Sequence, residues 1–209
     1  MRLAVLVSGG GSTLANIIDA IAGGSLHAEI ALVISSRREA LALERAKQHK
    51  LPLLVIRPRD FASPADFDAC LCQTLREAEV DLVVLGGYLS MLGRETVSAF
   101  SGRIMNIHPS LLPAFGGRGM YGLKVHSAVL AYGCRVSGAT VFFVDEGADS
   151  GPIILQAAVP VLAADTPGSL AARVAQVEKT LYPQAIKLFG EGRLGLEGRR
   201  VKISEVQDR

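Results

Sequence analysis

Two polar residues near the middle of the chain, Asn106 and His108, lie two positions apart after an apolar run. If this run is a β-strand, residues two apart point to the same face, so the amide and the imidazole would lie side by side. An amide can donate a hydrogen bond to an oxygen that becomes negative, and an imidazole can transfer a proton. Taken alone, the pair is equally compatible with two polar residues that merely end a strand.

A second polar segment, D-E-G-A-D-S-G-P at residues 145–152, separates two apolar runs. It contains three acids that could pair with an imidazole and favour its charged form, namely Asp145, Glu146 and Asp149. Spacing alone does not choose among them. Without other information, a polar hairpin loop with glycines at its turn is the more frequent explanation of such a segment.

The segment S-G-G-G-S-T at residues 8–13 lies between a short apolar run and an amphipathic pattern. Glycines let the backbone approach a ligand closely, and the first turn of a helix offers unpaired N–H groups that attract anions. The segment therefore favours a phosphate site, with Ser12 as the cap of the helix. It lacks the Gly-Lys-Ser/Thr of a Walker loop and the third glycine of a dinucleotide fingerprint. A plain strand-to-helix turn is the alternative.

Two arginines, Arg37 and Arg38, follow the second apolar run of the chain. A dinucleotide-binding fold can use an arginine at this point to hold the 2′-phosphate of NADP. An NADP-dependent reductase is therefore an alternative function, although two exposed arginines are the more frequent explanation.

These candidate residues need a scaffold, and the apolar periodicity predicts one. Short, nearly continuous apolar runs are typical of strands buried on both faces, and here they alternate with helical patterns. This alternation predicts an α/β fold with an open doubly wound sheet. The expected strands are residues 3–7, 30–34, 53–56, 82–85, 103–107, 136–144 and 153–159, with a tail hairpin at 195–203. The expected helices begin at residue 12 and cover 40–49, 63–78, 121–132 and 169–189.

Composition narrows the class of protein. The 209 residues carry 22 basic and 20 acidic side chains, a balance that does not favour nucleic acid as a partner. No apolar stretch is long enough to span a membrane, and the first residues do not form a secretory signal, so we expect a cytoplasmic protein. The three cysteines, Cys70, Cys72 and Cys134, lack metal-type spacing, and no metal site is expected.

Four segments together resemble the folate-dependent formyltransferases along nearly the whole chain. In order they are V-S-G-G-G-S, V-V-L-G-G-Y-L, N-I-H-P-S-L-L-P and V-D-E-G-A-D-S-G-P-I-I. The resemblance implies a Rossmann-like open twisted sheet with a parallel N-terminal half and mixed C-terminal strands. It also implies transfer of a formyl group from 10-formyltetrahydrofolate to the amine of 5-phosphoribosylglycinamide, in de novo purine biosynthesis, without a metal.

The resemblance also assigns residues. Asn106, His108 and Asp149 match the catalytic trio of the family. The acceptor phosphate would be held by Gly11, Ser12 and Thr13, and the acceptor ribose by Glu178, in V-E-K-T-L-Y-P. The residues that match the folate-binding positions are Leu89, Ser90, Met91, Leu92, Asn106, Asp145, Glu146 and Gly147.

No internal repeat, low-complexity linker or change of composition marks a domain boundary, so we expect one domain over residues 1–209. Residues 1–100 would be the nucleotide-type half that binds the acceptor phosphate, and residues 101–209 the half for catalysis and folate binding. Only small-molecule substrates are expected as partners, with the protein a monomer or a homodimer.

Three positions depart from the family pattern. Pro64 and Ser90 stand where some members carry arginines near the glutamate tail of the folate, and Phe142 stands where histidine is common. Other formyltransferases and the formyltetrahydrofolate deformylases share the fold and remain alternatives. They normally add a nucleic-acid-binding or a regulatory domain, for which we expect no room in this chain.

Overall fold

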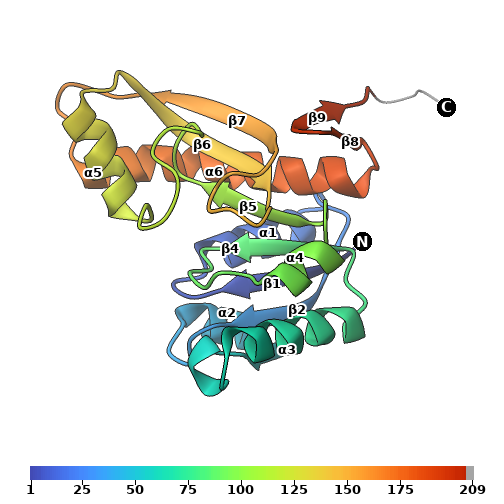
Figure 1. Cartoon of the computed structure of the whole chain (residues 1–209). Helices are drawn as coiled ribbons and strands as arrows, with labels where there is room; N and C mark the ends of the chain where they lie inside the picture. The colour runs from blue at the N-terminus through green and yellow to red at the C-terminus, as the bar shows by residue number, and fades with distance from the viewer. Residues whose placement is uncertain (206–209) are drawn as a thin grey trace. The chain divides into compact units, whose positions relative to one another are not determined.

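The computed structural model describes residues 1–205 (Figure 1). The chain divides into two compact units, the first covering Met1–Asn106 and the second beginning at Ile107. Strand β5 crosses this boundary. The prediction of a single domain remains a prediction.

The first unit is built on parallel strands in the order β3-β2-β1-β4-β5. Strand β1 lies in the middle and all five residues from Leu3 to Val7 are fully buried, as expected for an apolar run covered on both faces. The strands are β1 (Arg2–Val7), β2 (Glu29–Ser35), β3 (Leu53–Val55), β4 (Leu82–Gly86) and β5 (Ile104–His108).

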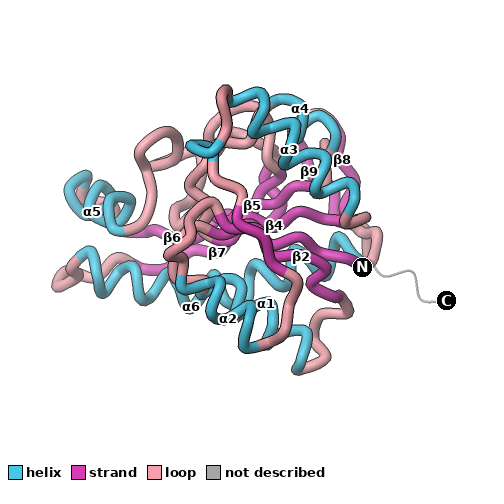
Figure 2. Tube along the Cα trace, turned by 90° about the horizontal axis from the view of Figure 1, so that it is seen from below, coloured by secondary structure: helices cyan, strands magenta, loops and turns pink. Residues whose placement is uncertain are grey.

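Helices cover both faces of these strands. Figure 2 shows α1 and α2 on one face and α3 and α4 on the other, the arrangement that right-handed crossovers produce in a doubly wound sheet. The helices are α1 (Ser12–Ala22), α2 (Leu41–Gln48), α3 (Pro64–Glu77) and α4 (Arg94–Ala99), with a short 3₁₀ turn η1 (Pro58–Asp60).

The second unit contains an antiparallel strand pair, β6 and β7, against which α6 packs. Helix α6 begins with a capping box in which Thr166 and Ser169 satisfy each other's backbone N–H groups, and Pro167 occupies its first turn. Helix α5 also packs on α6. The elements are α5 (Leu123–Tyr132), β6 (Val136–Phe143), β7 (Ile153–Pro160), α6 (Pro167–Gly190), β8 (Leu194–Glu197) and β9 (Arg200–Ile203).

The expected α/β fold, with a parallel N-terminal half and antiparallel strands added in the C-terminal half, is confirmed. Every expected strand and helix is present with bounds shifted by at most two residues. Within residues 1–205, no helix combines the length and the apolar character that a membrane crossing requires.

Two expectations about helices need correction. Ser12 is not the cap of α1; Gly11 holds that position with a left-handed φ of 73°, and no side chain caps the helix. Helix α4 was not expected, because its cap comes from another helix. The buried carboxylate of Asp68 accepts the N–H groups of Gly93 and Glu95 at 3.0 and 2.8 Å, a contact between residues about 25 positions apart.

Candidate active site

The glycine-rich turn after β1 presents an uncapped helix start. Gly9 and Gly10 are exposed, and an added Cβ on either would meet nothing within 4 Å. Gly11 differs, because a Cβ there would lie 2.7 Å from the Cα of Ala42 in α2, and its φ is positive. The first N–H groups of α1 therefore remain without a side-chain partner, the condition that favours an anion at a helix N-terminus.

A buried hydroxyl ties this turn to the segment after β4. Ser8, 2% exposed at the end of β1, accepts the N–H of Leu89 at 2.9 Å and lies 2.6 Å from the hydroxyl of Ser36. The hydroxyl of Ser8 thus links the start of the predicted phosphate loop to Leu89, the first residue of the predicted folate segment. Nothing in the sequence indicated this contact, because it joins residues 81 positions apart.

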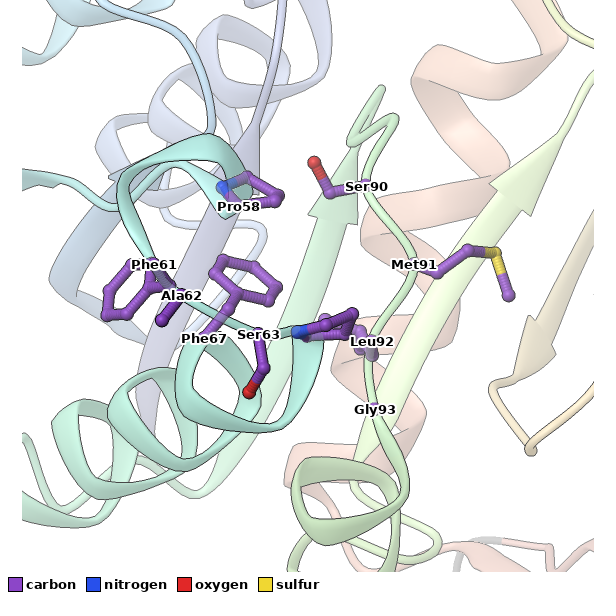
Figure 3. Close-up of a pocket in the computed structure, with 10 residues that line it drawn as sticks. Pro58, Phe61, Ala62, Ser63, Phe67, Ser90, Met91, Leu92 and Gly93 are labelled. Carbon is purple, nitrogen blue, oxygen red and sulfur yellow. The ribbon is translucent and has the colours of Figure 1, made fainter.

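Ser90, Met91 and Leu92 line a pocket of about 490 Å³ in the first unit (Figure 3). In Figure 3 the ring of Pro58 and the hydroxyl of Ser90 lie near one end of this pocket. Among the described residues that line it, none is charged, and Leu89 is absent from the lining although it is exposed. The lining residues are Pro58, Phe61, Ala62, Ser63, Pro64, Phe67, Ser90, Met91, Leu92 and Gly93.

Pro64 and Ser90, the two positions at which the resemblance leads us to expect arginines in some family members, belong to this lining. Arg57, which precedes Pro58 in the chain, forms an ion pair with Asp60 and lowers the pKa of that carboxyl group. The charges of Arg38 and Arg59 lower it further. The pocket itself suits the uncharged, aromatic part of an elongated ligand.

In the second unit, a buried imidazole meets a carboxylate. Oδ2 of Asp149 lies 3.5 Å from Nδ1 of His108, and the two side chains are 17% and 5% exposed. The other ring nitrogen, Nε2, lies 2.8 Å from the carbonyl oxygen of Phe115. A carbonyl only accepts, so Nε2 carries a proton. An oxygen that can accept a hydrogen bond therefore lies beside each ring nitrogen of His108.

The backbone at this contact is unusual. Asp149 and Phe115 are non-glycine residues with left-handed φ angles of 54° and 56°. Oδ2 of Asp149 also accepts the N–H of Gly117 at 2.9 Å, which helps to hold the carboxylate in place. Non-glycine residues in this conformation concentrate at functional sites, where surrounding contacts maintain them.

A hydrogen-bonded core fixes the loop that follows His108. The buried hydroxyl of Thr140 in β6 accepts the N–H of Leu112 at 3.0 Å and donates to the carbonyl of Ser110 at 2.7 Å. Gln156 in β7 donates to the carbonyl of Leu112 at 2.9 Å. Strands β6 and β7 thus hold the loop whose Phe115 carbonyl lies beside Nε2 of His108.

The three acids of the loop after β6 have different surroundings. Asp145 is engaged inside the loop, where Oδ1 accepts the N–H of Gly147 at 3.0 Å and the hydroxyl of Ser150 at 2.6 Å. Glu146 is exposed, and among the described residues Asp149 is the acid whose carboxylate lies within ion-pair distance of His108, at 3.5 Å. Tertiary structure therefore makes the choice that spacing left open.

Two further predicted residues, Asn106 and Glu178, and the departing position Phe142 occupy distinct places. Asn106 lies on β5 opposite Leu85 of β4 and two residues before His108, half-buried. Glu178, on α6, is partly exposed, and burial raises the pKa of its carboxyl group to about 7. Phe142 is 2% exposed on β6 and belongs to the core of the second unit.

A second buried histidine, His126, was not identified as a candidate from the sequence. It is 4% exposed on α5, its Nδ1 has no hydrogen-bond partner within residues 1–205, and burial together with the charge of His108 lowers its pKa. Within the same residues, no cluster of three or more His, Cys, Asp or Glu side chains has the arrangement of a metal site.

The comparisons with known proteins agree with this fold and these motifs. Residues 1–186 match the family described as formyl transferase, and the chain belongs to that family.

Its relatives are more specific. A phosphoribosylglycinamide formyltransferase from Haemophilus influenzae is 40% identical over 94% of this chain and 90% of its own length. The chloroplastic phosphoribosylglycinamide formyltransferase of Vigna unguiculata is 45% identical over 92% of this chain, which spans only 62% of that relative's length. Among solved structures, a glycinamide ribonucleotide transformylase from Symbiobacterium toebii superposes with a TM-score of 0.92 at 46% identity, covering 98% of this chain and 94% of the other.

Proposed function

We propose that this chain transfers the formyl group of 10-formyltetrahydrofolate to the amine of 5-phosphoribosylglycinamide, giving formylglycinamide ribonucleotide and tetrahydrofolate in purine biosynthesis. The observation that carries the proposal is the buried contact between His108 and Asp149, at the two residues that match the family's motif. The names of the relatives support the choice of acceptor.

In the proposed reaction, the acceptor amine attacks the formyl carbon and the carbonyl oxygen becomes an oxyanion. The side-chain amide of Asn106 would stabilise this oxygen by donating a hydrogen bond, and His108 would stabilise it through the positive charge of its imidazolium. Asp149 would orient the imidazole and stabilise the positive charge on its ring as the oxyanion forms. The bond to the folate nitrogen then breaks, that nitrogen gains a proton, and the former amine loses one.

The proposal assigns the acceptor to two places. Gly11, Ser12 and Thr13 would hold its phosphate, supported by the uncapped start of α1. Glu178 would accept hydrogen bonds from the ribose hydroxyls. A carboxylate partly removed from water makes stronger hydrogen bonds than a fully solvated one, which suits this role.

The donor would use the segment 89–92 and the loop that begins at Asp145. The uncharged pocket beside Ser90, Met91 and Leu92 would take the aromatic part of the folate. In the loop, Asp145, Glu146 and Gly147 would contact the pterin, with the internal hydrogen bonds of Asp145 holding the loop in shape. The proposed mechanism uses no metal ion.

We further propose a cytoplasmic enzyme, monomeric or homodimeric, with small molecules as its only substrates. The relative from Vigna unguiculata is chloroplastic by name, so the compartment differs among relatives.

One assay tests the proposed function. Purified protein is mixed with 10-formyltetrahydrofolate, and tetrahydrofolate formation is followed by absorbance with and without phosphoribosylglycinamide. We expect folate turnover only when the acceptor is present. Turnover without it would indicate a deformylase, and a thermal shift with NADPH but none with folate would indicate a reductase.

A further inference from the structure

Helix α2 anchors the glycine-rich turn through two carbonyl groups. The backbone N–H of Ala42 donates to the carbonyl of Gly9 at 3.1 Å. The side chain of Arg45, one turn further along α2, donates from Nε to the carbonyl of Gly10 at 3.0 Å. Gly11 then passes so close to Ala42 that no Cβ fits between them.

These two contacts determine where the N–H groups of the turn point. In a trans peptide, the carbonyl of one residue and the N–H of the next point in opposite directions. Because the carbonyls of Gly9 and Gly10 face α2, the N–H groups of Gly10 and Gly11 face away from it. Neither N–H group has a hydrogen-bond partner within residues 1–205.

We infer that Arg45 is a positioning residue for the acceptor: by holding the carbonyl of Gly10, it keeps the N–H of Gly11 directed at the phosphate. The inference rests on the proposed function, which assigns the phosphate to this turn. Arginine suits the task because its planar guanidinium fixes the direction of the Nε–H bond, whereas the ammonium of lysine lies on a flexible stem.

The test is the variant Arg45→Met, which keeps much of the apolar stem and removes the donor. We expect the acceptor KM to rise about tenfold or more, the amount associated with losing a hydrogen bond to a charged group. The donor KM should change less than twofold. Lys47→Met is the matched control, because Lys47 is on the same helix and pairs only with exposed Glu44 among the described residues. That variant should behave like the parent protein.

Two further measurements separate geometry from charge and from folding. The effect of Arg45→Met should persist at high salt, since screening weakens a long-range charge but not a positional constraint. Arg45→Lys, which keeps the charge, should remain impaired. Thermal stabilisation by inorganic phosphate should be smaller in Arg45→Met than in Lys47→Met, and this readout does not require formyl transfer.

The outcomes are distinct. A parent protein without formyl transfer refutes the proposed function, while the phosphate measurement still tests the role of Arg45. If the parent is active, an unchanged acceptor KM in Arg45→Met refutes the inference. Full recovery in Arg45→Lys, or loss of the effect at high salt, would show that Arg45 contributes only charge.

Discussion

Oδ2 of Asp149 accepts the N–H of Gly117 at 2.9 Å and lies 3.5 Å from Nδ1 of His108. The backbone contact fixes the carboxylate, so the imidazole meets a charge that is already in place. A charge that is already in place does not have to be reoriented when the transition state forms. Substitution of Asp149 therefore tests the proposed mechanism directly.

Asp149→Asn should lower kcat by about 10²–10⁴-fold, the range associated with general acid–base help. The change removes the negative charge beside His108 but keeps the shape of the side chain, and asparagine tolerates the left-handed backbone at this position. Both KM values should change much less, because the interaction matters most in the transition state. Steady-state kinetics with each substrate varied in turn provide the measurement.

The neighbouring acids are the controls for that experiment. Glu146→Gln, at an exposed position, should leave kcat near the parent value. Asp145→Asn should affect the donor KM more than kcat, since Asp145 orders the loop through Gly147 and Ser150. Loss of turnover in Glu146→Gln with normal turnover in Asp149→Asn would refute the proposed trio.

Substitutions in the glycine turn should separate folding from binding. Gly11→Val should destabilise the protein by at least about 1–2 kcal/mol, because a side chain there adopts a left-handed backbone and meets Ala42 at 2.7 Å. Gly10→Val meets open space, so the fold should persist while the acceptor KM rises severalfold and the donor KM changes little. Urea unfolding and kinetics check both statements; equal effects of Gly10→Val on the two KM values would assign the turn to the wrong substrate.

Glu178 should make stability fall as pH rises. Burial raises the folded-state pKa of its carboxyl from the ordinary 4.5 to about 7. Between these values the folded state keeps a proton that the unfolded state has lost, so the stabilisation present below pH 4.5 disappears as pH rises through 7. Glu178→Gln stays neutral, and its free energy of unfolding should exceed that of the parent by roughly 1–3 kcal/mol at pH 8 but not at pH 4.5. Urea unfolding of the parent and of Glu178→Gln at both pH values is the measurement. A difference in unfolding free energy that does not change with pH would contradict the raised pKa of Glu178.

The same variant should weaken acceptor binding. If Glu178 accepts hydrogen bonds from the ribose, Glu178→Gln at pH 8 should raise the acceptor KM by roughly tenfold, corresponding to about 1.5 kcal/mol for a charge-assisted bond. The donor KM serves as the internal control. An acceptor KM equal to that of the parent would leave Glu178 as a partly buried helical acid without a role in binding.

The uncharged pocket predicts weak discrimination between folate tails. With Pro64 and Ser90 in the lining, monoglutamyl and polyglutamyl donors should have KM values within about threefold of each other, since surface charge pairs contribute only about 0–1 kcal/mol. Ser90→Arg should create a preference for the longer tail that decreases with salt. A strong preference in the parent protein would mean that other cations, such as Arg38 and Arg59, hold the tail.

The sequence by itself determined the scaffold. Apolar runs such as residues 3–7 and 82–85 can only be buried on both faces, and their alternation with amphipathic segments leaves a doubly wound α/β fold as the consistent solution. The strand spacing of Asn106 and His108 follows from local geometry alone. Helix α4 was not predicted from the sequence, because the carboxylate that caps it, Asp68, belongs to another helix.

Tertiary structure decided which side chains meet. Spacing along the chain could not choose among Asp145, Glu146 and Asp149, and only the resemblance to the family pointed to Asp149. In the folded chain, Asp145 bonds within its own loop and Asp149 lies beside His108. The sequence also could not reveal that Arg45 holds Gly10 or that Ser8 holds Leu89. Such contacts depend on packing between segments distant along the chain, and local periodicity carries no information about them.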